Sequence, residues 1–476
     1  MNGVSHAKRQ ALTPMIIPFA QLGAIYDHIT GTFLDAQALA AQATERAGTL
    51  KAQGVGPGAI VAITHGGTSA FFVDLLAVWS CGAAAACLDP ALTESERSNV
   101  IAFCNPAVVL HETSREVRTT TPTRPGTLDD TALLLFTSGT TGAPKGVALS
   151  FRAIHARLAL NGYEIGKQTL SATLVTLPTH FGHGLIGNAL TPLWAGGTIH
   201  LVPRGLSLAQ SLGSLIDTHA ITFMTSVPSL WQMALRMSAT PKGKTLKRVH
   251  VGSAPLSAVL WTRIAEWCGC ETVNCYGITE TANWIGGASN ATFTPADGLI
   301  GRPWGGSAAI RLADGTIVQQ GEGEVLIQTP ALMQGYHGRP DLTAAVLQDG
   351  WYATGDIGEI DASGTIRLTG RAKDEINRGG FKVQPAEIDM LLERHEDVAE
   401  ACVFAIPDQV SGEIVAAAVK LMPHAATDGK ALREWCLKYL RREATPERWF
   451  IVDEIPKTSR GKVSRDLVRK ALLEKP

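Results

Sequence analysis

Short apolar segments alternate with longer segments of helical character along the first half of the chain. Residues 59–64 (AIVAIT) and 84–88 are continuous apolar runs that predict buried strands, and residues 70–80 predict an apolar helix between them. Strands that are apolar on both faces are typical of a parallel sheet covered by helices. The same alternation predicts further strands at residues 107–110, 133–136, 174–177, 198–202, 221–225 and 248–251. We therefore predict an α/β fold in which a large N-terminal region forms doubly wound sheets.

The pattern changes near Gly301, where short strand-like segments are separated by turn signals. This pattern of short strands and turns predicts a more antiparallel, barrel-like subdomain over about residues 301–371. The remaining chain is mixed and predicts a small α+β domain, with a helix around residues 385–394, a strand around residues 399–405 and a C-terminal helix from about residue 465. Because single cores stop growing near about 250–300 residues, a chain of 476 residues is expected to divide. We place an N-terminal domain at residues 1–371 and a C-terminal domain at residues 372–476.

Composition and charge narrow the class of protein. Hydrophobic residues make up 45% and charged residues 18%, which is typical of a globular chain and not of a disordered one. The formal net charge of -1 provides no overall field for nucleic acid or an anionic membrane, so we expect neither as a partner. Proline and glycine interrupt the longest uncharged stretch, residues 168–203, which argues against a membrane span. The eight cysteines are sparse and favour reduced thiols and a cytoplasmic location.

A dense run of small and hydroxylated residues follows the strand predicted at residues 133–136. Residues 136–146 read FTSGTTGAPKG, and such a loop can direct backbone N–H groups, hydroxyls and one lysine at phosphate oxygens. Pro144 stands where a Walker A loop requires its second glycine, so this is a phosphate loop of another kind. The candidate phosphate-binding residues are Thr137, Ser138, Gly139, Thr140, Thr141, Gly142 and Lys145.

This loop resembles the signature loop of the adenylate-forming superfamily, which includes acyl-CoA synthetases, free-standing adenylation domains and firefly luciferase. Further segments are similar to the other motifs of that superfamily and occur in the same order. They are residues 252–255 (GSAP), 276–280 (YGITE), 352–356 (YATGD), 370–376 (GRAKDEI) and 456–462 (PKTSRGK). Each motif alone is weak, but their order and spacing together are specific.

The resemblance implies roles for the matching residues. Thr279 would contact the α-phosphate of ATP, Glu280 would hold Mg²⁺, and Lys462 would supply positive charge at the reacting carboxylate. We take these three as catalytic candidates. The remaining nucleotide contacts implied by the resemblance are Gly252, Ser253, Ala254, Pro255, Tyr276 and Gly277 around the adenine, Asp356 and Arg371 at the ribose, and Lys382 at the α-phosphate.

In the superfamily, the position that Lys373 matches is a hinge about which the C-terminal domain swings between two reactions. The resemblance therefore implies a mobile C-terminal domain, first for adenylate formation and then for thioester formation with CoA. A carrier-protein phosphopantetheine thiol or an amine-type nucleophile is the alternative acceptor. A non-catalytic adenylate-binding protein is least favoured, because it would be expected to lack Lys462, Glu280 or Asp356, and all three are present.

The pocket for the acid is implied less clearly. Matching segments place His180, Phe181, His183, Gly184, Val227 and Asn283 around it. Phe181 stands where many relatives carry histidine, and the aspartate that binds an α-amino group is absent from this segment, which argues against an α-amino acid. We interpret His180 and His183 as pocket or structural histidines and not as metal ligands. We thus expect an enzyme that uses ATP, Mg²⁺ and CoA to activate a small carboxylic acid, while the acid and the oligomeric state stay open.

Overall fold

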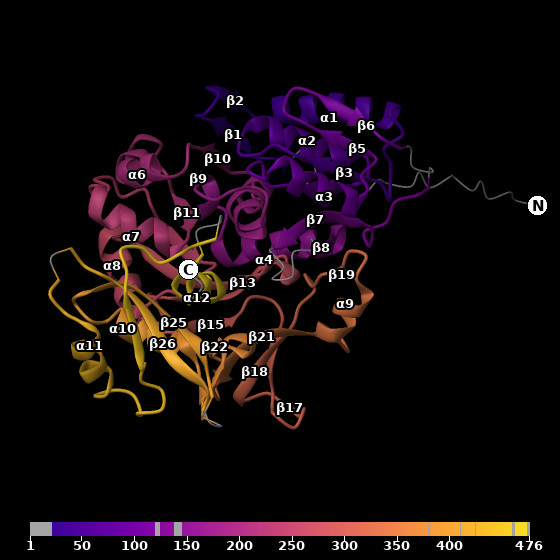
Figure 1. Ribbon diagram of the computed structural model, residues 1–476. Coiled ribbons are helices and arrows are strands. Elements are labelled where there is room, and N and C mark those ends of the chain that lie inside the picture. Colours follow the sequence, from indigo (N-terminus) through magenta and orange to yellow (C-terminus); the bar gives the residue numbers. More distant parts are fainter. Residues whose placement is uncertain are drawn as a thin grey trace, which may run out of the picture.

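The computed structural model describes residues 21–119, 124–137, 145–378, 381–409, 411–423, 425–458 and 462–473. Figure 1 shows two sheets with flanking helices in the N-terminal part of the chain and a third, smaller sheet near the C-terminus. The predicted fold class, a mixed α/β protein with large N-terminal sheets and a small C-terminal domain, is confirmed.

The first sheet has seven strands, and its centre is parallel. Strands β5, β3, β4 and β7 run parallel, while β6, β8 and β19 extend the sheet by antiparallel pairing. In spatial order the strands are β19 (Gly335–Tyr336), β8 (Lys145–Ser150), β7 (Thr131–Thr137), β4 (Ala84–Cys87), β3 (Ile60–Ile63), β5 (Val108–Leu110) and β6 (Arg115–Val117).

The second sheet begins with a parallel half. Strands β1, β10, β9, β11, β12 and β13 are parallel neighbours, and β2 pairs antiparallel with β1 at the edge. Their bounds are β2 (Thr32–Leu34), β1 (Ala24–Asp27), β10 (Thr198–Leu201), β9 (Ala172–Val175), β11 (Phe223–Ser226), β12 (Arg248–Gly252) and β13 (Glu271–Ile278).

The antiparallel strands expected after Gly301 are present, and they continue this second sheet. Strand β14 pairs with β13, and β15 then joins β14 to the remaining strands. The bounds are β14 (Asn283–Ser289), β15 (Leu299–Pro303), β22 (Ile366–Arg371), β21 (Trp351–Ile360), β18 (Gly321–Gln328), β16 (Ser307–Arg311), β17 (Ile317–Val318) and β20 (Leu347–Gln348). These antiparallel strands are therefore joined to the parallel strands by an unbroken series of strand pairs, and the barrel-like subdomain stays a prediction.

Helices cover the sheets and contribute many of the core side chains. The helix predicted at residues 70–80 is α2, whose Phe72 is fully buried and whose Trp79 indole N–H donates to the Ala132 carbonyl at 2.8 Å. The largest core includes side chains of both sheets, for example Leu133 and Leu201, so the two sheets share it. The helices of this part are α1 (Ala36–Ala52), α2 (Ser69–Ser80), α3 (Glu94–Cys104), α4 (Phe151–Ile165), η2 (Thr169–Ser171), η3 (His183–Leu190), α5 (Thr191–Trp194), α6 (Leu206–Thr218), α7 (Pro228–Met237), α8 (Ala258–Cys268), η4 (Thr279–Thr281) and α9 (Pro340–Val346). None of the helices in the described ranges is long and apolar enough to cross a membrane.

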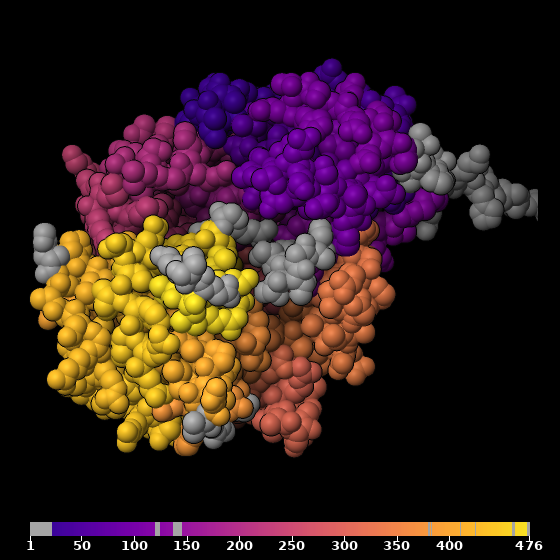
Figure 2. Space-filling model, in the orientation of Figure 1, coloured from indigo at the N-terminus to yellow at the C-terminus, as the bar shows by residue number. Residues whose placement is uncertain are grey.

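The C-terminal part has a sheet and cores of its own. Its elements are η5 (Ala372–Asp374), β23 (Ile376–Arg378), β24 (Phe381–Val383), α10 (Pro385–Leu392), β25 (Val398–Asp408), β26 (Gly412–Leu421), α11 (Gly429–Cys436), β27 (Arg448–Ile451) and α12 (Arg465–Leu473). Figure 2 shows its yellow and light-orange surface directly against the magenta and darker orange surface of the preceding part. An ion pair between Arg394 and Asp297 joins the two parts. The proposed boundary at residue 371 stays a prediction.

Candidate active site

The predicted phosphate loop connects two paired strands of the first sheet. Thr137 at the end of β7 is in register with Lys145 at the start of β8. The backbone of Thr137 is described, but its side chain is not, and Ser138, Gly139, Thr140, Thr141 and Gly142 lie outside the described residues. Their phosphate contacts therefore stay predictions.

Lys145 lies among residues of other motifs. Its ammonium is 4.0 Å from Glu280 Oε1 and 3.7 Å from the centre of the Tyr336 ring, and the Tyr336 hydroxyl donates to the same Glu280 oxygen at 2.8 Å. Burial lowers the pKa of Lys145, the charge of Glu280 opposes this shift, and the nearby positive charge of Lys373 adds to it. The loop lysine, the predicted magnesium ligand and the predicted hinge residue are thus within electrostatic reach of one another.

Glu280 is held in a short helical turn, η4, together with Thr279. Glu280 is buried and Thr279 is half-buried. The two residues that follow η4, Ala282 and Asn283, both have positive φ angles, +54° and +97°, which are uncommon for residues other than glycine and often mark functional sites. The chain therefore turns sharply directly after the predicted catalytic pair.

Arg157 stabilises the backbone at the end of η4. It is fully buried in helix α4, and its Nε donates to the Thr281 carbonyl at 3.2 Å, while burial lowers its pKa to about 9. This interior arginine therefore fixes the backbone at the end of η4 by a hydrogen bond between distant positions of the chain. Sequence reasoning missed it, because Arg157 lies in an ordinary amphipathic helix outside every motif.

A second group of predicted nucleotide-binding residues forms where the two halves of the second sheet meet. Asp356 in β21 is in register with Arg371 in β22, and Arg371 Nε is 2.8 Å from Asp356 Oδ1. The Tyr276 hydroxyl donates to the other oxygen of Asp356. Asp356 is only 2% exposed, and burial raises its pKa although the Arg371 charge opposes the shift. The structure therefore brings together three residues that are up to 95 positions apart in the chain.

The predicted adenine-binding turn directly follows strand β12. A side chain at Gly252 would place its Cβ 2.7 Å from the Cys275 carbonyl oxygen, so the backbone of β13 can approach only a glycine there. Ser253 has a φ of +66°, and Ala254 and Pro255 are exposed. A Cβ at Gly277 would lie 2.5 Å from the Asn283 carbonyl oxygen, which again requires glycine.

His183 connects this turn to the predicted acid pocket. Its Nδ1 is 2.7 Å from Ser253 Oγ, and its Nε2 is 2.6 Å from Thr225 Oγ1. Burial lowers the pKa of His183 to about 3, with a further contribution from the positive charge of Lys462. The imidazole is therefore neutral at physiological pH, and Lys462 of the C-terminal part is close enough for its charge to act on it.

His183 begins a π-helix, η3, which lies between the strands predicted at residues 174–177 and 198–202. π-Helical turns are rare and are frequent at functional sites. Gly184 is required here, because its Cβ would lie 1.8 Å from the Pro178 carbonyl oxygen.

The other predicted pocket residues have different surroundings. His180 Nε2 is 3.2 Å from Asp89 Oδ2 and its ring meets Phe181 edge-on at 4.9 Å, so His180 and His183 have separate partners. Val227 is the half-buried residue that precedes helix α7, and Asn283 is buried beside Gly187.

The remaining predicted residues belong to the C-terminal part. Lys373 lies exposed in η5, and the backbone of Lys382 pairs with Asn377 in the β23–β24 hairpin. The side chain of Lys382 lies outside the described residues. The carbonyl of Lys462 accepts a hydrogen bond from Thr458 N at 2.8 Å.

Comparison with known proteins gives a consistent result. The model of the AMP-binding enzymes matches residues 23–127 and 112–337, and that of the AMP-binding enzyme C-terminal domain matches residues 387–462. The chain is 34% identical to an oxalate–CoA ligase of Arabidopsis thaliana over 354 residues, which cover 73% of this chain and 69% of the ligase.

Two solved structures are also similar. An amide bond synthetase, McbA, of Marinactinospora thermotolerans has a TM-score of 0.84 at 28% identity, with 95% of this chain and 98% of that chain covered. The O-succinylbenzoate CoA synthetase of Bacillus subtilis, in complex with ATP and a magnesium ion, has a TM-score of 0.82 at 24% identity, with 94% and 97% covered.

Proposed function

The chain belongs to the family of AMP-binding enzymes, in which its relatives include AMP-forming acid:CoA ligases, and from this premise we propose that it activates a carboxylic acid with ATP and transfers the acyl group to CoA. The resemblance drawn from the motifs is confirmed at the level of the family. The acid, the acceptor and the role of each residue belong to the proposal.

One observation carries the proposal. Residues from motifs far apart in the chain form two adjoining groups, Lys145 with Glu280, and Tyr276 with Asp356 and Arg371. The first group offers charge to phosphates, and the second offers a buried carboxylate to the two hydroxyls of a ribose. Tyr276 and Glu280 lie only four residues apart, so a single nucleotide can contact both groups.

The residues fit a magnesium ion bound with ATP. Mg²⁺ prefers one or two carboxylates together with phosphate oxygens and water. Glu280 supplies such a carboxylate beside the lysine of the phosphate loop, and its Oε1 is oriented by the Tyr336 hydroxyl. When bound, the ion would neutralise charge on the leaving pyrophosphate.

In the first step, a carboxylate oxygen of the acid bonds to the α-phosphorus, and the bond from that phosphorus to the β-bridging oxygen breaks, so that pyrophosphate leaves with the electron pair. Two anions must approach, and Lys462 offers the compensating charge from the C-terminal part. In the second step, the thiol sulfur of CoA bonds to the acyl carbon, AMP leaves, and the thiol proton passes to solvent.

The test is acid-dependent release of pyrophosphate with and without CoA. We expect Lys462→Ala to lower the turnover for adenylation by about 10²–10³-fold, the typical cost of removing one donor at a developing charge. Lys470→Ala, which removes an exposed lysine of the adjoining helix α12, is the matched control and should not change the rate. Release that is equal in both variants and wild type would refute this role for Lys462.

The acceptor is tested in the same assay. Turnover that requires CoA and yields a thioester supports the ligase. The similarity to an amide bond synthetase makes an amine the second candidate acceptor. Turnover that does not require CoA but increases with an added amine or with a phosphopantetheinylated carrier protein would show that this compound, and not CoA, is the acceptor. The adenylation step would remain in place.

The acid belongs, in this proposal, to the short acids that carry a second polar group. Of the described residues beside His183, Asn283 Nδ2, Trp284 Nε1 and both ring nitrogens of His250 are buried and have no hydrogen-bond partner. Unsatisfied buried donors each cost about 1–3 kcal/mol, which a substrate with hydrogen-bond acceptors would recover. The rings of His183, Trp284 and His250 also pack edge to face, at 5.5 and 4.7 Å between centres, which limits the room for a long apolar chain.

Asn283→Asp distinguishes this proposal from a pocket for plain alkanoic acids. Aspartate tolerates the positive φ of this position as asparagine does, but it replaces the donor by an acceptor. We expect the kcat/KM for a short dicarboxylate to fall about 10- to 100-fold, while that for a monocarboxylate of equal length changes little. Asn105→Asp, at the positive-φ end of helix α3, is the control. An equal loss for both acids would contradict the polar pocket without affecting the adenylation claim.

A further inference from the structure

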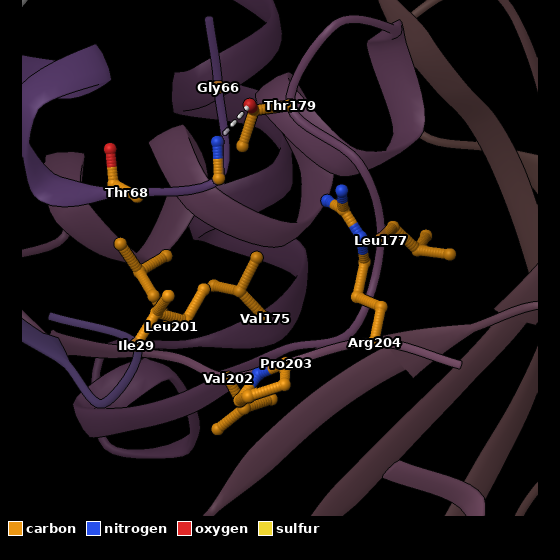
Figure 3. A pocket seen from close by; sticks show the side chains of 11 residues that line it. Ile29, Gly66, Thr68, Val175, Leu177, Thr179, Leu201, Val202, Pro203 and Arg204 are labelled. Carbon is orange, nitrogen blue, oxygen red and sulfur yellow. Dashed lines mark hydrogen bonds between the residues drawn. The ribbon is translucent and has the colours of Figure 1, made fainter. Parts of the chain in front are cut away.

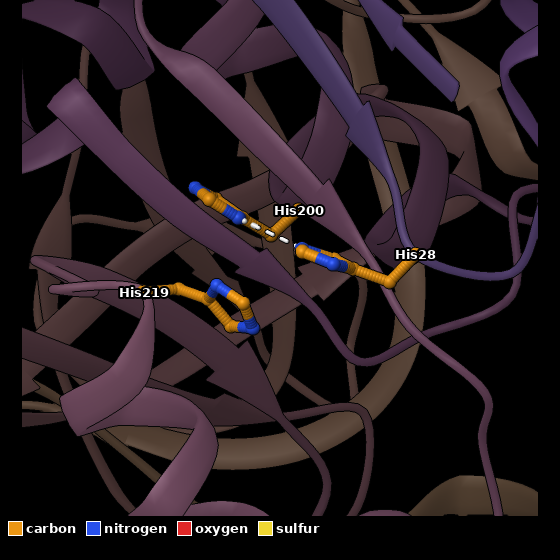
Figure 4. Close-up of side chains that lie close together, drawn as sticks. All are labelled: His28, His200 and His219. Atoms are coloured by element: carbon orange, nitrogen blue, oxygen red, sulfur yellow. Dashed lines mark hydrogen bonds between the residues drawn. The ribbon is translucent and has the colours of Figure 1, made fainter. Parts of the chain in front are cut away.

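Three histidines that belong to no predicted nucleotide or acid site lie together at the edge of the second sheet. His28 follows strand β1, His200 lies in β10, and His219 ends helix α6. The rings of His28 and His200 lie close together because β1 and β10 are parallel neighbours. The end of α6 places the His219 ring beside them, as Figure 4 shows. The cluster therefore joins three separate elements of the fold.

The distances between the rings fit a metal ion. His28 Nε2 is 3.1 Å from His200 Nδ1, and one ring nitrogen of each histidine lies within 4.8 Å of the other two. In a tetrahedral zinc site with Zn–N bonds of about 2.0–2.1 Å, two ligand nitrogens are about 3.3 Å apart. His28 and His200 are already at nearly this spacing, and a movement of the His219 ring by less than about 2 Å would complete the site.

The rings are also in the right chemical state. Burial, followed by the neighbouring rings of His219 and His28, lowers the pKa of His200 to about 4, and burial lowers the pKa values of His28 and His219. Neutral imidazole is the form that binds metal. The partial negative charge at the C-terminal end of α6 and the carboxylate of Asp27, whose charge acts on His28, both favour a cation here.

We propose that His28, His200 and His219 form a binding site for a divalent transition-metal ion, of which zinc is the probe occupant. Imidazole nitrogens suit zinc, nickel and copper, whereas magnesium prefers oxygen ligands. The ion would fasten β1 and β10 to the end of α6, and it would be separate from any magnesium ion that accompanies ATP.

Access to the site is available from a cavity of about 270 Å³. Both His28 and His219 line it, together with Ser207 and Ser211 of α6, so water or a small ligand can take the fourth coordination position. Val202 and Pro203 line both this cavity and a neighbouring one, which Figure 3 shows. The polar side chains of the neighbouring cavity are Thr68, Thr179 and Arg204. The described residues that line this second cavity include no imidazole, thiol or carboxylate, and we therefore assign the ion to the histidine cluster.

The test is calorimetric titration of zinc into the full chain, prepared without a histidine tag and freed of metal with a chelator. We expect about one zinc ion per chain, and a visible absorption spectrum of tetrahedral geometry when Co²⁺ replaces zinc. Replacing His28 and His219 together by glutamine should weaken zinc binding by at least about 100-fold. Zinc should raise the melting temperature of the wild type and not of this double variant.

His155→Gln is the matched control, because His155 is an exposed histidine of helix α4 outside the cluster. It should bind zinc like the wild type. Unchanged far-ultraviolet circular dichroism and unchanged acid-dependent pyrophosphate release would establish that the double variant is folded. Zinc binding by the folded double variant that equals that of the wild type, or a wild type that binds no zinc, would overturn the proposal.

Discussion

The surroundings of Asp356 indicate a bound ligand more directly than those of the other predicted site residues. Asp356 is only 2% exposed, and its carboxylate contacts the guanidinium of Arg371 and the hydroxyl of Tyr276. Burying a charged carboxylate costs free energy, and burial accordingly raises the pKa of Asp356. Two hydroxyls of a ribose would add charge-assisted hydrogen bonds to the same group.

Asp356→Asn keeps the shape of the side chain and removes its charge. We expect the KM for ATP to rise about 10- to 100-fold, because hydrogen bonds to a charged group contribute about 1.5–3 kcal/mol. Steady-state kinetics of pyrophosphate release at varied ATP measures this. The matched control is Asp361→Asn, an exposed aspartate in the turn between β21 and β22. An unchanged KM in the Asp356 variant would mean that the carboxylate holds Arg371 and Tyr276 and not the nucleotide.

Residues in motifs could be predicted from the sequence, whereas their supports could not. Asp356, Arg371 and Tyr276 were predicted as nucleotide contacts, and the structure places them together, although their roles stay predictions. Arg157 gave no such signal, because its contact with the Thr281 carbonyl joins positions that no local pattern connects. The histidine cluster went unnoticed for the same reason, since its members are up to 191 residues apart.

At the scale of elements, the π-helix η3 determines where His183 points. A π-turn inserts one residue into a helical ladder, and hydrophobic periodicity alone does not reveal it. The strands were predictable because continuous apolar runs are typical of buried parallel strands, as in β3 and β4. The position of η3 depends instead on the close approach of Gly184 to the Pro178 carbonyl, which is a tertiary feature.

Gly184→Ala should therefore displace the start of η3. The added Cβ would lie 1.8 Å from a backbone oxygen, which cannot move without shifting the chain. We expect a loss of about 1–3 kcal/mol in the free energy of unfolding, typical of overpacking, together with a lower kcat/KM for the acid. Gly48→Ala in helix α1, where nothing lies within 4 Å of the new Cβ, should instead stabilise the chain by up to about 1 kcal/mol. Urea unfolding measures both, and equal stability of the two variants would contradict the packing argument.

At the scale of the whole molecule, the division into a large and a small part was predicted from the chain length and from the change in the pattern of predicted strands and helices. The sequence did not reveal that β14 and β15 join the antiparallel strands to the parallel sheet, because strand pairing between distant segments is not a local property. Nor could it locate the contact between the two parts. There, Glu393 lies near Asp389 and Glu400 of the C-terminal part and near Asp297 of the N-terminal part.

Burial, followed by the charge of Asp389 and the other carboxylates, raises the pKa of Glu393 to about 8 from an ordinary value of 4.5. The folded chain therefore binds this proton more tightly than the unfolded chain does. The corresponding stability is fully present below pH 4.5 and is lost as the pH rises through about 8. Deprotonation places a new negative charge beside Asp297, so the contact with the N-terminal part should weaken over the same range.

Glu393→Gln fixes the neutral form and should remove this loss. We expect the variant to be more stable than the wild type by about 1–3 kcal/mol at about pH 9, and to differ little at about pH 5. Glu396→Gln, three positions further along and exposed, is the control and should follow the wild type at both pH values. Urea unfolding at each pH measures the difference. A Glu393→Gln variant whose stability follows the wild type from about pH 5 to about pH 9 would show that Glu393 titrates as an ordinary surface carboxylate, and that the contact between the two parts is insensitive to it.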